Sequence, residues 1–264
     1  MSRSVSRRVH IVDEARGFTI LLMVLYHAWF MMGYMFDWEI GKTLFDFFKH
    51  DVPAQPFFAG LFIFICGISC NFSHSNLKRG LKLVAFGAAV TLCMWCGVFW
   101  GILDRSSYIW FGILHCLGVC VLLYTLLRPT LRLIPPIVGV LISLALLVFC
   151  WHVPFEHGGY FGIQNLFTIP VPEAPANDPW LYAFGLCPIY GVSDYFPLIP
   201  WSFAFFMGSF VGVWAKEGKF PAFCYRPHLP ILSKIGKQTL WIYVFHQPVV
   251  YVILLGVEAI LKLF

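Results

Sequence analysis

Long apolar segments separated by short polar stretches run along most of this chain. Seven of them approach the length of about 20 residues that a helix needs to cross a bilayer, and each holds few or no charged residues. They cover residues 17–36, 55–72, 81–103, 109–127, 135–151, 199–215 and 239–258. The pattern therefore predicts an all-α protein, a polytopic transmembrane helix bundle with seven spans.

Two segments decide how the spans are counted. The first span follows a basic N-terminus, as a signal peptide does, but it is too long for the apolar part of one and lacks a small-residue cleavage site. Residues 180–192 are apolar but too short to cross, so we expect a re-entrant or interfacial piece there, with an eighth span as the alternative. The length of 264 residues predicts one integral membrane domain, residues 1–264, with an extracytoplasmic loop at 153–198.

The composition supports a membrane protein. Apolar residues make up 59% of the chain and charged residues 12%, and the mean hydropathy is +0.78. A soluble domain has about 45–50% apolar and about 25% charged residues. These values exclude a disordered chain and a soluble nucleic-acid-binding protein, so the lipid bilayer is the expected environment and no nucleic-acid partner is expected.

The charged residues predict the orientation of the bundle. If the N-terminus lies inside, fourteen of the eighteen Lys and Arg residues fall in inner segments, as the positive-inside rule requires. Acidic residues gather in the outer segments instead. The inner face is therefore suited to polyanions and the outer face to neutral or cationic groups. For any single loop, the positive-inside rule alone explains the charges more simply than a bound ligand does.

Three histidines, His27, His115 and His246, lie deep within predicted spans. An ionisable group inside a membrane is a functional candidate by default, and histidine can take and return a proton near neutral pH. A neutral histidine that only hydrogen-bonds a neighbouring helix is the structural alternative for each one. Arg16 lies eleven residues before His27, so both project from one helix face about 16 Å apart. Such an arginine can hold an anionic group at the inner surface, although charged helix ends before a span are common.

The outer loop, the cysteines and two glycines carry weaker signals. Residues 153–198 contain no Lys or Arg and many aromatic residues, which predicts either a cap that stacks on sugars or an aromatic belt at the headgroups. Cys93 and Cys96 form a CxxC without a second ligand pair, so no metal site is expected. Gly208 and Gly212 allow close helix approach, within the chain or in a homodimer.

Five short motifs, in one order along the chain, resemble those of a known family. In the first, VDEARGFTILLMVLYH, ten residues separate Arg16 from His27. The others are FIFICGIS at 62–69, FGILHCLG at 111–118, SDYFPLIPW at 193–201 and LWIYVFHQP at 240–248. The first motif is similar to that of membrane acyltransferases that O-acetylate bacterial surface glycans. The set more closely resembles bacterial relatives of lysosomal heparan-α-glucosaminide N-acetyltransferase.

This resemblance implies an acyl-CoA-dependent N- or O-acyltransferase in a bacterial inner (plasma) membrane. It would move an acyl group, expected to be acetyl, from cytosolic acyl-CoA to an extracytoplasmic sugar, amino sugar or glycan. Acetyl-CoA is thus the expected co-substrate. The resemblance implies that Arg16 meets the CoA phosphates together with Arg79 and Lys82, and we place His246 on this donor side as well.

The resemblance also implies roles for the other histidines. His27 is expected to be the base that deprotonates the acceptor, with His115 as its partner or as an acceptor-orienting group. This chain differs from the lysosomal enzyme at that position, because the lysosomal enzyme has Asn in place of His27 and its active His in the following outer loop. The nearest match to that residue is His50, which ranks second. The residues expected to line the acceptor side are Asp194, Tyr195 and Trp201.

A proton-coupled small-molecule transporter is the main alternative. The three histidines would then form a proton relay, and Pro248 could break the last span. Transporters of this kind often contain inverted repeats, and no clear internal repeat is visible in this sequence. A catalytically inactive scaffold is a further alternative, but it leaves the motif residues without a purpose. Direct transfer and an acyl-histidine intermediate cannot be told apart from the sequence.

Overall fold

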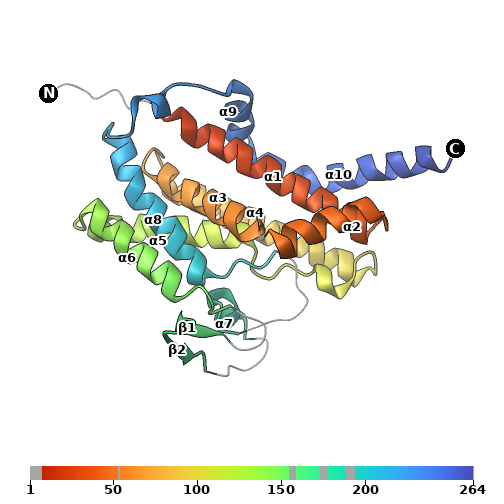
Figure 1. The fold of residues 1–264 in the computed structure, drawn as a ribbon, viewed down its shortest axis with the longest axis horizontal. Coiled ribbons are helices and arrows are strands. Elements are labelled where there is room, and N and C mark those ends of the chain that lie inside the picture. Colours follow the sequence, from red (N-terminus) through yellow and green to blue (C-terminus); the bar gives the residue numbers. More distant parts are fainter. Residues whose placement is uncertain (1–7, 53, 155–158, 173–177, 188–193, 264) are drawn as a thin grey trace. The chain divides into compact units, whose positions relative to one another are not determined.

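The computed structural model describes residues 8–52, 54–154, 159–172, 178–187 and 194–263 (Figure 1). A helix coincides with each of the seven predicted apolar segments. These helices are α1 (His10–Tyr34), α3 (Ala54–Cys70), α4 (Asn76–Phe99), α5 (Ile113–Leu131), α6 (Pro136–Phe149), α8 (Leu198–Lys216) and α10 (Thr239–Leu261). The prediction of a polytopic helical membrane protein is therefore confirmed.

Five of the described helices, α1, α4, α5, α8 and α10, are long and apolar enough to cross a membrane. A sixth span results if α3 is counted with the bent helical segment before it, which consists of α2 (Glu39–Asp46) and the π-helical turn η1 (Phe47–Asp51). Helix α6 has only 14 residues. The count of seven spans and the inward N-terminus stay predictions.

The long loop after α6 contains a β-hairpin, which the all-α prediction did not include. Strands β1 (Tyr160–Ile163) and β2 (Phe167–Pro170) pair antiparallel, and Asn165 has a positive φ of 67° in the turn between them. Phe149 at the end of α6 packs against an aromatic ring from each strand. Aromatic and β-branched residues on both sides of a turn-forming Asn are the local signal for such a hairpin.

The apolar stretch at 180–192 begins as the short helix α7 (Pro179–Phe184), capped by the Asp178 side chain. Its six residues cannot cross a bilayer. Residues 188–193 lie outside the described part of the chain.

The chain divides into two compact units, which are described separately. In the first, residues 1–65 and 220–264, α1 packs against α2, α10 and α9 (Pro230–Lys237). In the second, residues 66–219, α4 packs on α5 and α8 packs on α5 and α6. Gly212 of α8 approaches Ile68 and Asn71 within this second unit, which accounts for a small residue there without a dimer. A homodimer and a single catalytic domain stay predictions.

The contact of α1 with α9 depends on two glycines. A Cβ at Gly236 would collide with the backbone oxygen of Asp13, and a Cβ at Gly17 would collide with the backbone oxygen of Leu232. The two backbones therefore touch directly, and any side chain at either position has to separate the helices.

We expect Gly236→Val to lower the free energy of unfolding by about 1–3 kcal/mol, because the added side chain forces α9 away from α1. Thermal unfolding in detergent measures the effect. Gly256→Val is the matched control, since Gly256 has open space around its Cβ position. Equal melting temperatures for the two variants would contradict this account of the α1–α9 contact.

Candidate active site

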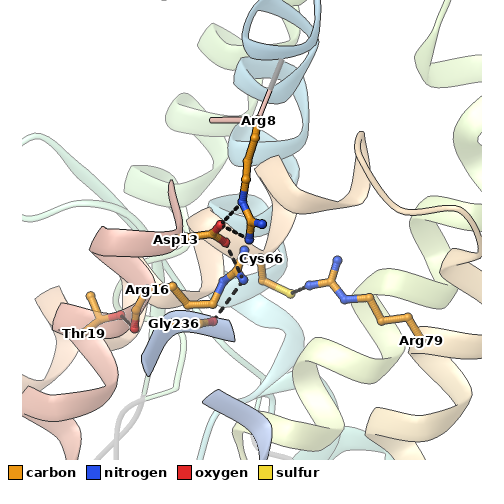
Figure 2. Close-up of polar contacts among 7 residues, drawn as sticks. All are labelled: Arg8, Asp13, Arg16, Thr19, Cys66, Arg79 and Gly236. Atoms are coloured by element: carbon orange, nitrogen blue, oxygen red, sulfur yellow. Dashed lines mark hydrogen bonds and ion pairs between the residues drawn. The ribbon is translucent and has the colours of Figure 1, made fainter. Parts of the chain in front are cut away.

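The polar start of α1 is held by one carboxylate between two arginines. Asp13 is buried, and its Oδ2 accepts hydrogen bonds from Arg8 Nε and Nη2 at 2.9 and 2.6 Å. Arg16 Nη1 lies 3.3 Å from Asp13 Oδ1 and donates to the carbonyl oxygen of Gly236 at 3.2 Å (Figure 2). Arg16 is therefore fixed between α1 and α9.

Glu14 provides a second anchor that the sequence analysis did not single out. Its carboxylate is buried and accepts the backbone N–H groups of His228 and Leu229 at 2.8 and 3.0 Å. These groups directly precede α9, where helical N–H groups lack partners within the helix. Two adjacent acids in an otherwise basic inner segment were the available signal. Helix α1 consequently begins at His10, seven residues before the predicted span.

Two of the predicted residues, His27 of α1 and His246 of α10, lie side by side with ring centroids 4.9 Å apart. His27 Nδ1 is 2.9 Å from the carbonyl oxygen of Met23, and His246 Nδ1 is 2.6 Å from that of Tyr243. A carbonyl oxygen only accepts, so each Nδ1 carries the hydrogen and each neutral ring keeps a lone pair on Nε2. A neutral ring at either position can therefore accept a proton at Nε2.

The surroundings of His246 strengthen this assignment. The residue is 7% exposed, and its Nε2 is buried without a hydrogen-bond partner among the residues that the structure describes. A buried acceptor without a partner is costly, which marks a place where a proton or a donor from a substrate can bind. The sequence placed His246 on the donor side; its contact with His27 is new.

His115 has the opposite hydrogen arrangement. It lies in the first turn of α5, and its Nδ1 accepts the backbone N–H of Gly112 at 3.3 Å. In the neutral ring the hydrogen then sits on Nε2, so His115 is a donor. Its ring lies against Gly87 of α4, where a Cβ would be only 3.0 Å from ring atoms. His115 belongs to the second unit, and its pairing with His27 stays a prediction.

Asp194 supports the same helix start. Its Oδ2 accepts the backbone N–H of Ile113 at 3.3 Å, and it adopts a positive φ of 51°. A Cβ at Gly112 would collide with this carboxylate, so the contact requires glycine there. The structure therefore shows Asp194 as a cap of α5 close to His115, and its role in acceptor binding stays a prediction.

The other predicted acceptor residues are packed against neighbouring aromatic rings. The Tyr195 hydroxyl donates to the carbonyl oxygen of Tyr182 at 2.8 Å, and their rings stack 4.3 Å apart. Burial raises the pKa of both phenols, so they remain protonated at neutral pH. Trp201 is 9% exposed and packs on Trp151 and Phe196.

The remaining predicted residues differ in their surroundings. Arg79 Nη2 donates to the thiol sulfur of Cys66 at 2.9 Å (Figure 2), and its Nη1 is 3.7 Å from the sulfur of Cys70. Lys82 on α4 and His50 in η1 are exposed. The structure thus brings His27 to His246 and Asp194 to the first turn of α5, and it leaves Lys82 and His50 at the surface.

Comparison with known protein families places this chain in a family. The family model described as heparan-alpha-glucosaminide N-acetyltransferase, catalytic, matches residues 8–248. Comparisons with curated proteins and with solved structures find no match. The matched range contains every candidate residue from Arg16 to His246, and it confirms the resemblance that the five motifs indicated.

We expect Gly112→Ala and Asp194→Ala to be non-additive. Gly112→Ala should cost about 1–3 kcal/mol of stability by overpacking, and Asp194→Ala about 1 kcal/mol by loss of the cap. In the double variant the carboxylate that the new Cβ would strike is gone, so the total should fall short of the sum by at least about 0.5 kcal/mol. Thermal unfolding of all four proteins in detergent measures this coupling, and strict additivity would contradict the contact.

Proposed function

The chain belongs to the heparan-α-glucosaminide N-acetyltransferase catalytic family of membrane acetyltransferases, and we propose that it transfers an acetyl group from cytosolic acetyl-CoA to an extracytoplasmic sugar, amino sugar or glycan. The observation that carries this proposal is the contact of the His27 and His246 rings, in which each Nδ1 faces a carbonyl oxygen and a neutral ring is left with Nε2 as its proton acceptor. An acyl transfer to a hydroxyl or amine needs a group that removes the acceptor proton as the new bond forms.

In the proposed reaction His27 is that base. The acceptor oxygen or nitrogen attacks the thioester carbonyl carbon while its proton passes to His27 Nε2. The carbon–sulfur bond then breaks, CoA leaves as the thiolate, and the proton goes to this sulfur, so that free CoA and the acylated acceptor are formed. His246 lies against His27, and its buried Nε2, which has no hydrogen-bond partner among the described residues, can share the proton.

His115 and Arg16 have complementary proposed roles. His115 carries its hydrogen on Nε2, which suits it to orient an acceptor oxygen by donating a hydrogen bond. Arg16, Arg79 and Lys82 are proposed to bind the CoA phosphates, because guanidinium and ammonium groups pair with phosphate. Asp194, Tyr195 and Trp201 are proposed on the acceptor side, and His50 is the second candidate for the base.

We further propose that the N-terminus faces the cytosol and that the protein lies in a bacterial inner membrane. The excess of Lys and Arg in the segments assigned to the inner side supports this orientation. It also places Arg16 on the side from which cytosolic acetyl-CoA arrives.

We expect His27→Asn to reduce CoA release about 10²–10⁴-fold, because the acceptor proton loses its base. The assay uses purified protein in detergent with acetyl-CoA and a panel of free sugars and amino sugars, and it follows CoA by chromatography. Two matched variants are His50→Asn, which tests the second candidate, and His74→Asn, a substitution at an exposed position outside the proposed site.

The pattern of these variants separates the candidates. A loss in His27→Asn with normal rates in the other two supports His27 as the base, whereas a loss only in His50→Asn transfers that role to His50. Absence of CoA release by folded wild-type protein with every acceptor would refute the acetyltransferase. Proton flux in vesicles would then test the transporter alternative, for which two adjacent histidines are equally suited.

We expect Arg16→Gln to raise the KM for acetyl-CoA about tenfold or more with a smaller change in kcat, because it removes a charged contact to the donor. Asp13 keeps its bonds to Arg8 in this variant, so the start of α1 retains a paired carboxylate. Arg105→Gln, at a predicted outer position, is the control. A loss confined to kcat would argue against phosphate binding by Arg16.

A further inference from the structure

In the described part of the second unit, two arginines at one end have no carboxylate partner. Arg79 lies in the first turns of α4, and its guanidinium meets the thiol sulfurs of Cys66 and Cys70. Thiols are weak hydrogen-bond acceptors, so these contacts replace little of the hydration that the guanidinium loses on burial.

The second arginine, Arg128, lies in the last turn of α5. Its Nε is buried and has no hydrogen-bond partner among the residues that the structure describes. One turn earlier, the Tyr124 hydroxyl donates to Asn71 Oδ1 at 3.3 Å, and Asn71 directly follows Cys70. Arg128 follows Tyr124 by one helical turn, so it lies at the end of α5 that reaches the segment next to Cys70. Gly80, the neighbour of Arg79, packs against Leu122 of α5, so Arg79 and Arg128 lie at the same end of the packed helices α4 and α5.

No described carboxylate of this unit compensates the pair. Asp104 and Asp194 lie at the opposite ends of α4 and α5, and Asp178 caps α7. Glu217 forms an ion pair with Lys219 at 2.7 Å. Two partly buried positive charges without a counterion repel one another and lose hydration, so this arrangement favours an added anion.

We propose that Arg79 and Arg128 together bind a phosphate group at this end of the second unit. The planar guanidinium presents parallel N–H donors that match two phosphate oxygens, and two such groups can neutralise a doubly charged phosphate. The phosphate can belong to CoA, in which case the inference rests on the proposed function, or to the headgroup of an anionic phospholipid, in which case it does not. Arg128 is then a binding residue that the sequence motifs did not include.

The test measures the two sources separately in purified protein. Adenosine 3′,5′-bisphosphate is titrated into detergent-solubilised protein by calorimetry, and retention of phosphatidylglycerol is followed by native mass spectrometry. The variant is Arg128→Gln, and the matched control is Arg132→Gln, which removes the same charge from an exposed position one turn further along. Arg128→Lys keeps the charge but cannot form the bidentate hydrogen bonds of a guanidinium. Melting temperatures show that each variant is folded.

We expect Arg128→Gln to weaken one of these ligands about tenfold or more, Arg128→Lys to weaken it less, and Arg132→Gln to leave it within about threefold of wild type. Weakened bisphosphate binding identifies the CoA phosphate, and weakened lipid retention identifies the headgroup. If folded Arg128→Gln and Arg128→Lys bind both ligands as Arg132→Gln does, the inference is overturned.

Turnover separates this inference from the proposed function. With acetyl-CoA as donor, a CoA phosphate at Arg128 predicts a raised KM in Arg128→Gln; with S-acetylpantetheine, which lacks phosphates, KM should not change. A wild-type protein that binds either phosphate ligand through Arg128 but releases no CoA refutes the acetyltransferase and leaves the phosphate site standing. Normal turnover with equal KM values for both Arg→Gln variants, together with unchanged lipid retention, refutes the site alone.

Discussion

Polar groups on membrane-spanning helices must find partners within the protein, because the bilayer interior offers no water. Several do so locally: the Thr19, Thr125 and Ser209 hydroxyls each donate to a carbonyl oxygen three or four residues earlier. Asn71 shows the same constraint between helices, since its amide donates to the Ser209 carbonyl oxygen and accepts from Tyr124. Against this background, the groups left without a partner in the described part of the chain stand out as places for a ligand.

The constraint also determines the chemical form of the histidines. In the middle of a helix, the acceptor closest to Nδ1 is a carbonyl oxygen of the preceding turn, which has a second lone pair, so a neutral His27 or His246 keeps its hydrogen on Nδ1. In the first turn the backbone instead offers an unused N–H, and His115 accepts it. Position along a helix thus gives two neutral rings that can accept a proton at Nε2 and one that can donate a hydrogen bond from Nε2.

The sequence predicted what is periodic and local, and it missed contacts between distant segments. All seven apolar segments are helical because a long apolar run favours a helix, in which every backbone group can bond within the segment. Five of these helices also have the length and hydropathy of a span. Arg16, His27 and His115 were recognised because charged or titratable groups are rare in such segments. The approach of His246 to His27, and that of Asp194 to the first turn of α5, join residues far apart in the chain, and periodicity does not encode such pairs. Helix α1 begins early because Glu14 bonds to a segment more than 200 residues away.

Arg16 and Arg79, which are both proposed to bind acetyl-CoA, differ in how much interaction energy each would gain from a phosphate. Arg16 already faces a buried carboxylate and a carbonyl oxygen, so an incoming phosphate has to compete with Asp13 for its donors. Arg79 faces thiols, which compete weakly. The gain in electrostatic and hydrogen-bond energy on binding phosphate is therefore larger at Arg79, while Arg16 is better suited to hold α1 and α9 together. If both contact the donor, Arg79 should contribute more to its affinity, and Arg16 should contribute more to the stability of the fold.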